Sequence, residues 1–185
     1  LTQAQAARAR NLRDLWCNKR LSKLNPSRES PAPAEPFVLV VDQSAGDRSI
    51  ALGQAGPESF RRMLANALDQ NPDCTVVVKV HPDVIRGRAR GHFRPADLCH
   101  PRIQLCSDGL HPAALLEGAR AVYVVTSQMG FEALLWGRTV HCFGMPFYAG
   151  WGLTRDRLAA PSRRNAAVQL EAVVHAALVA GTRCV

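Results

Sequence analysis

Polar residues that could bind an anion stand at the ends of three short apolar runs in this chain. These runs are rich in β-branched residues, as is typical of buried strands in a parallel sheet. Open parallel sheets bind their ligands beyond the carboxyl ends of the strands. The pattern therefore indicates a nucleotide-type binding crevice at one sheet edge, with these candidate residues: Gln43, Asp47 and Ser49 after the first run, Lys79, His81 and Pro82 at the second, and Thr126, Ser127 and Glu132 after the third.

Each candidate also has a simpler structural explanation, which the sequence leaves open. The hydroxyls of Thr126 and Ser127 follow a strand and precede a helix, where they could cap the helix or help its free N–H groups attract a phosphate. His81 could be an ordinary turn histidine, although the proline after it presents the imidazole outward. Asp47 could make only a local turn hydrogen bond. Glu132, one helical turn past Ser127, could face the crevice or the solvent.

Strands and helices alternate along the chain from Phe37 onward. A helix should open at Pro57, because proline is favoured in the first turn and apolar residues follow at helical spacing. The other helices are expected to begin near Pro112, at about 128 and at about 165, the last two ending near 136 and 180. The expected strands are 37–42, 74–80, 103–106, 121–125 and 139–143. This alternation favours an α/β fold, a Rossmann-like parallel sheet with helices on both faces.

Composition divides the chain into three parts. Residues 1–24 favour helix, and the prolines of residues 25–36 make that stretch a linker. Residues 37–185 form the Rossmann-like domain. Within it, the loop 144–157 is rich in glycine and aromatic residues, and we expect it to be a packed lid or wall, with a base-stacking platform as the alternative.

The formal net charge of +8 comes mainly from arginine and favours anionic partners such as nucleotide phosphates, acidic sugars or phospholipid headgroups. Nucleic acid is not an expected partner, because the densest basic run, 86–90, is short and no recognised nucleic-acid motif is present. Six cysteines without a Cys-x-x-Cys pair argue against a metal site and a disulfide framework, and they favour a reducing, cytoplasmic compartment.

Four blocks of sequence carry a more specific signal. They are Gln43-Ser-Ala-Gly-Asp47-Arg-Ser49, Lys79-Val-His81-Pro82-Asp83, Thr126-Ser127 with Gly130-Phe-Glu132-Ala-Leu-Leu, and Pro146-Phe-Tyr-Ala-Gly-Trp-Gly152. Together these blocks resemble the capsule polysaccharide biosynthesis proteins of KpsC type, which are retaining β-Kdo glycosyltransferases. The resemblance covers roughly residues 8–157.

The resemblance implies one half of a GT-B-like glycosyltransferase module, with residues 37–185 as its nucleotide-sugar-binding domain. Such an enzyme transfers Kdo from CMP-Kdo, its donor substrate, to a lipid-linked anionic glycan acceptor with retention, and it needs no cofactor and no metal. The implied location is the cytoplasm, and a peripheral contact with the inner membrane is compatible with the acceptor. The alternative is a catalytically incomplete binding or scaffold domain of the capsule biosynthesis and export system.

The resemblance also implies roles for three of the candidate residues. Breaking the Kdo–CMP bond develops positive charge at the anomeric carbon and negative charge on the leaving phosphate, so a carboxylate suits the first and a histidine with a helix N-terminus suits the second. Retention is commonly explained by two displacements through a carboxylate adduct. The resemblance implies Asp47 as the catalytic carboxylate, and His81 and Ser127 as the residues that bind the CMP phosphate. From their positions at the same strand ends, Glu132 is a second catalytic candidate, and the further nucleotide-binding candidates are Gln43, Ser49, Lys79, Pro82 and Thr126.

Overall fold

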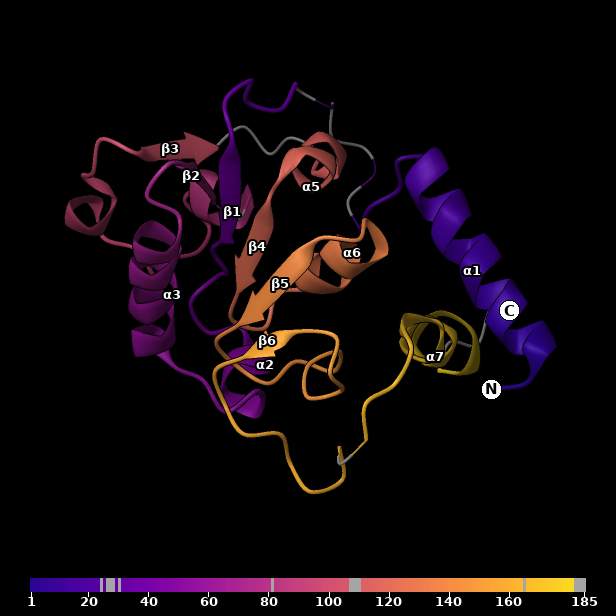
Figure 1. Cartoon of the computed structure of the whole chain (residues 1–185). Helices are drawn as coiled ribbons and strands as arrows, with labels where there is room; N and C mark the ends of the chain where they lie inside the picture. Colours follow the sequence, from indigo (N-terminus) through magenta and orange to yellow (C-terminus); the bar gives the residue numbers. More distant parts are fainter. Residues whose placement is uncertain are drawn as a thin grey trace.

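A parallel sheet forms the centre of the computed structural model, which describes residues 1–23, 25, 29, 31–80, 82–106, 111–164 and 166–181 (Figure 1). The strand order is β3-β2-β1-β4-β5-β6, and every neighbouring pair is parallel. This is a doubly wound order, and its direction of winding reverses between β1 and β4. The predicted fold class is confirmed. The strands are β1 (Phe37–Val41), β2 (Thr75–Lys79), β3 (Ile103–Cys106), β4 (Ala121–Val124), β5 (Thr139–Cys142) and β6 (Arg155–Asp156).

Helices cover both faces of this sheet (Figure 1). They are α1 (Gln3–Asn18), α2 (Arg48–Leu52), α3 (Pro57–Gln70), α4 (Pro82–Ile85), α5 (Ala113–Gly118), α6 (Met129–Leu135) and α7 (Leu170–His175), with a 3₁₀ turn η1 (Pro95–Leu98) and a π-helical turn η2 (Ala176–Ala180). The N-terminal helix α1 packs on α7 and α6 at the outer side of the molecule. The division into parts 1–24, 25–36 and 37–185 stays a prediction.

Strand β1 shows why both faces must be covered. All five of its residues are buried, and alternate side chains enter two different apolar clusters. Leu39 packs in the cluster under α5 and α6, which contains Phe131, whereas Val40 packs in the cluster under α3, which contains Phe60 and Met63. A strand buried on both sides reads as a continuous apolar run, which is what the sequence shows.

The last predicted helix was placed wrongly at its start. It was expected from about 165, but α7 begins at Leu170. The backbone N–H of Val168 donates to the carbonyl of Trp151 at 3.0 Å, so this stretch is held by the aromatic loop and does not continue the helix toward the N-terminus. The short elements α2 and β6 were not predicted, because neither has enough residues to show a hydrophobic period.

Candidate functional site

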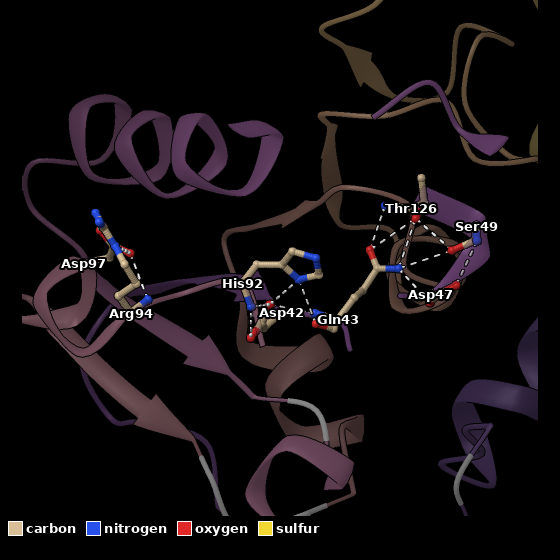
Figure 2. Close-up of polar contacts among 8 residues, drawn as sticks. All are labelled: Asp42, Gln43, Asp47, Ser49, His92, Arg94, Asp97 and Thr126. Carbon is tan, nitrogen blue, oxygen red and sulfur yellow. Dashed lines mark hydrogen bonds and ion pairs between the residues drawn. The ribbon is translucent and has the colours of Figure 1, made fainter. Parts of the chain in front are cut away.

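Gln43 is the centre of a hydrogen-bonded cluster between the carboxyl ends of β1 and β4 (Figure 2). Its Nε2 lies 3.1 Å from Asp47 Oδ2, 3.3 Å from Ser49 Oγ and 3.0 Å from Thr126 Oγ1. Its Oε1 accepts from the backbone N–H of Thr126 at 2.9 Å, which fixes the orientation of the amide. These four residues meet where the strand order reverses, and ligands bind at that point in folds of this class.

The methyl group of Thr126 packs against two glycines, Gly53 and Gly144, where a larger residue would not fit. A Cβ at Gly53 would lie 2.4 Å from the Thr126 methyl carbon, and a Cβ at Gly144 would lie 2.8 Å from it. With the methyl group packed in this way, the hydroxyl points to the other side, where it contacts Gln43 and lies 3.0 Å from Ser49 Oγ. The side chain is therefore positioned by packing as well as by hydrogen bonds.

Asp47 uses its two carboxylate oxygens differently. Oδ1 accepts from the backbone N–H of Ser49 at 2.9 Å and so caps α2, which is the local bond that the simpler explanation predicted. Oδ2 accepts from the Gln43 amide. Burial alone would raise the pKa of Asp47, but the hydrogen bonds from Ser49 and Gln43 outweigh it and place the pKa below its usual value. The group is thus an exposed, ionised carboxylate at neutral pH, and its catalytic role stays a prediction.

Ser127 has its hydroxyl at the start of α6, where it accepts from the Met129 backbone N–H at 3.3 Å. Its carbonyl accepts a short hydrogen bond from the buried phenol of Tyr148, which comes from the aromatic loop. Gly130 makes this contact feasible, because a Cβ there would lie 2.2 Å from the Tyr148 hydroxyl oxygen. The aromatic loop therefore acts here as a packed wall. The phosphate-binding role of Ser127 stays a prediction.

Glu132 is only 1% exposed, so the alternative of a solvent-facing helix position is wrong. Its Oε2 accepts from the Ser22 hydroxyl at 2.7 Å, and its Oε1 accepts from the Lys23 backbone N–H at 3.4 Å. Burial raises the pKa of this carboxyl, although the two hydrogen bonds and the cations of Lys23 and Lys79 act in the opposite direction. Glu132 ties the segment after α1 to α6, and its catalytic role stays a prediction.

Lys79 ends β2 and is buried. Burial lowers the pKa of its ammonium group, while Cys106 and Glu132 act in the opposite direction. His81 and the side chain of Pro82 lie outside the described residues. The nucleotide-binding roles of Lys79, His81 and Pro82 therefore stay predictions.

Within the ranges that the structure does describe, no group of three or more His, Cys, Asp or Glu residues could hold a metal ion. No helix in these ranges is long and apolar enough to cross a membrane.

The raised pKa of Glu132 predicts a pH-dependent effect of Glu132→Gln on stability. Between the ordinary pKa of the unfolded chain and the raised pKa of the folded state, the folded protein keeps a proton that the unfolded chain has released. The free energy of unfolding of the wild type therefore falls as pH rises through this window. Glutamine cannot ionise and escapes this loss, so the stability of Glu132→Gln relative to wild type should increase with pH.

Denaturant unfolding between pH 4 and pH 8 measures this difference. The exposed Glu35 provides the matched control, because Glu35→Gln makes the same chemical change at a surface position. A stability difference for Glu132→Gln that stays constant across the range would contradict the assigned burial.

Sequence reasoning placed neither Asp42 nor His92, which lie beside this cluster, among the candidate site residues. Asp42 directly precedes Gln43 and is 4% exposed, and its carboxylate contacts His92 from the segment after α4 (Figure 2). The sequence did carry a signal for Asp42, because this carboxylate directly follows an apolar strand and charged residues are rarely buried. His92 had no local signal, because its partners lie about fifty residues away in sequence.

Comparison with known proteins gives consistent results. The profile of the family described as "Capsule polysaccharide biosynthesis protein" matches residues 2–183. The capsule polysaccharide modification protein LipA of Neisseria meningitidis serogroup A is 41% identical over 159 residues, which cover 82% of this chain and 22% of LipA. The lipopolysaccharide-processing protein LpsZ of Rhizobium meliloti is 36% identical over 148 residues, which cover 77% of this chain and 33% of LpsZ.

Two solved structures resemble this chain closely. The β-Kdo 2,4 transferase of Thermosulfurimonas dismutans KpsC superposes with a TM-score of 0.87 at 38% identity, covering 96% of this chain and 56% of that one. The β-Kdo 2,7 transferase of the same protein superposes with a TM-score of 0.74 at 28% identity, covering 100% of this chain and 59% of that one. The chain thus spans little more than half of the solved transferases and about a fifth to a third of the two curated relatives.

Proposed function

This chain belongs to the capsule polysaccharide biosynthesis protein family, and we propose that it is the nucleotide-sugar-binding half of a glycosyltransferase that transfers Kdo from CMP-Kdo to a lipid-linked glycan with retention. The observation that carries the proposal is the cluster of Gln43, Asp47, Ser49 and Thr126 at the reversal point of a fold that superposes on a β-Kdo 2,4 transferase with a TM-score of 0.87.

The chemistry of the cluster suits the donor side of such a reaction. Asp47 is ionised and exposed, so its carboxylate can approach an anomeric carbon that becomes positive as the bond to the phosphate breaks. Its hydrogen bonds to Gln43 and Ser49 hold it in one geometry before substrate binds, which lowers the reorganisation that the reaction requires. In a retaining reaction this carboxylate forms the covalent sugar adduct and water or acceptor later displaces it.

The leaving group would be held next to the cluster. The Ser127 hydroxyl lies at the start of α6, one residue from Thr126, and β2, the strand that precedes His81 in the sequence, lies on the other side of β1 in the strand order. We assign the phosphate of CMP to this part of the sheet edge, with Lys79 as a nearby cation. The glycan acceptor would be bound by the half of the enzyme that lies outside this chain.

Nucleotide binding by this chain tests the proposal. CMP should bind measurably, and Ser127→Ala should weaken CMP binding by about ten- to a hundredfold, the effect of losing one hydrogen bond to a charged group. Cytidine, which lacks the phosphate, should lose much less affinity. Calorimetric titration of both ligands measures the two effects.

The exposed Ser162 offers a matched control, because Ser162→Ala should leave both affinities unchanged. Equal losses for cytidine and CMP in Ser127→Ala would mean that Ser127 shapes the pocket and does not contact the phosphate. Binding of CMP by a chain that supports no transfer, even when the other half of the enzyme is supplied, would favour the catalytically incomplete scaffold.

A further inference from the structure

A second buried polar contact lies directly beside the Gln43 cluster (Figure 2). The Asp42 carboxylate accepts from the His92 backbone N–H at 3.2 and 3.3 Å, and its Oδ1 lies 3.3 Å from His92 Nδ1. The same ring nitrogen lies 2.9 Å from the carbonyl oxygen of Gln43. The His92 ring also stacks on Phe60 of α3, with the ring centroids 3.7 Å apart and the planes within 3°. His92 is therefore fixed from three sides.

The local backbone allows this buried contact between Asp42 and His92. The side chains of Asp42 and His92 are 3% and 6% exposed, and a buried carboxylate is costly unless hydrogen bonds satisfy it. Burial raises the pKa of Asp42, whereas the bonds from Gln43 and His92 act against that rise. Gly91 lets the chain come close enough, because a Cβ there would lie 2.3 Å from Asp42 Oδ2. The close contact between Asp42 and the backbone of Gly91 and His92 therefore fixes the position of this segment.

That segment carries three exposed arginines in five residues, Arg86, Arg88 and Arg90. The carbonyl of Arg90 accepts from the backbone N–H of Ala45 at 2.6 Å, so the segment touches the loop between Gln43 and Asp47. Among the residues that the structure describes, no carboxylate pairs with these three guanidinium groups. Unpaired arginines beside a substrate-binding edge are suited to a charged ligand, because guanidinium binds phosphate and carboxylate in a bidentate geometry.

We propose that Asp42 and His92 are positioning residues that hold Arg88 and Arg90 next to the Gln43 cluster as a subsite for an oxyanion of the substrate, a phosphate or a carboxylate. The subsite rests on the proposed function in so far as its ligand is part of an anionic nucleotide sugar or glycan. The buried pair limits the motion of the segment, so that less conformational entropy is lost when the ligand binds.

Trypsin tests whether the pair positions the segment, without any assumption about function. His92→Phe keeps the ring that stacks on Phe60 but removes the ring hydrogen bond, and Asp42→Ala removes the acceptor. Both variants should be cleaved after Arg88 and Arg90 at least about fivefold faster than wild type, because local opening exposes these bonds. Asp42→Asn, which keeps an acceptor for the His92 N–H, should retain most of the protection.

Cleavage after the exposed Arg163 in the same digest is the internal control, and mass spectrometry of the fragments reports each bond separately. General destabilisation would accelerate all sites together. If His92→Phe and Asp42→Ala both leave the ratio of cleavage after Arg88 and Arg90 to cleavage after Arg163 unchanged, the positioning role is refuted.

Calorimetric titration tests the ligand. The double variant Arg88→Gln/Arg90→Gln is compared with Arg61→Gln/Arg62→Gln, which removes the same charge from α3. The probes are CMP, which has a phosphate and no carboxylate, and tetragalacturonate, which has carboxylates and no phosphate. The segment variant should lose about tenfold in affinity for one of them, the control variant less than about twofold, and the affected probe identifies the oxyanion.

His92→Phe should lower the affinity for the same probe as the arginine variant. A loss of affinity for tetragalacturonate alone would support the subsite even if the protein does not bind CMP-Kdo. The subsite and the proposed function can therefore fail independently. Unchanged affinity for both probes, or a loss confined to a DNA duplex tested in parallel, would overturn the subsite.

Discussion

Asp47→Asn should abolish sugar transfer in an enzyme that carries this chain together with the other half of the module. The expected loss is on the order of 10⁴-fold in turnover, the scale observed when a member of a catalytic group is removed. Asparagine keeps the oxygen that caps α2 through the Ser49 N–H, so the loop should stay folded while the negative charge is lost. Nucleotide binding should therefore remain largely intact.

The covalent intermediate makes this prediction specific. Wild-type enzyme given CMP-Kdo without acceptor should gain the mass of one Kdo on the peptide that contains Asp47, and the variant should gain none. Asp69→Asn on α3 is the matched control and should retain full turnover, because this carboxylate is exposed on a helix. Near-normal turnover of the Asp47→Asn enzyme would mean that Asp47 caps α2 and takes no part in catalysis.

Gln43→Ala should have the second-largest effect, because one side chain connects three partners. Its removal leaves the buried Thr126 N–H without an acceptor and takes a donor from Asp47. The unfolding free energy should fall by about 1–3 kcal/mol, the cost of unsatisfied buried groups. The pKa of Asp47 should move upward, since the Gln43 amide is one of the groups that lower it.

Thermal unfolding and the pH dependence of transfer measure these two effects. The melting temperature should drop by several degrees, at about 2–4 °C per kcal/mol for a chain of this size. Gln104→Ala is the matched control, because Gln104 is exposed on β3 and its removal should change neither quantity. The contrary result is a Gln43→Ala protein that keeps the melting temperature of the wild type and the same fall in transfer rate at low pH. That result would show that Gln43 does not stabilise Thr126 and Asp47 as its hydrogen bonds indicate.

Most of the strands and helices, and the residue types available for chemistry, follow from local patterns in the sequence. The five main strands were predicted from short runs rich in apolar residues, and the clearest of them, β1, is a continuous apolar run that is buried on both faces. Helix α3 was predicted from Pro57 because its buried residues, Phe60, Met63, Leu64 and Ala67, repeat at the helical period. Both signals are local, since they depend only on residues within a few positions of each other.

Which of these residues meet depends on how distant segments of the chain fold together. Gln43 and Thr126 are 83 positions apart, and Ser22 and Glu132 are 110 apart. Whether β4 pairs with β1 depends on how the connections cross over the sheet, and no short stretch of sequence specifies that order. The burial of Glu132 and the contact between Asp42 and His92 escaped prediction for the same reason. Contacts between distant segments form only once the sheet is assembled, so they leave no periodic pattern in the chain.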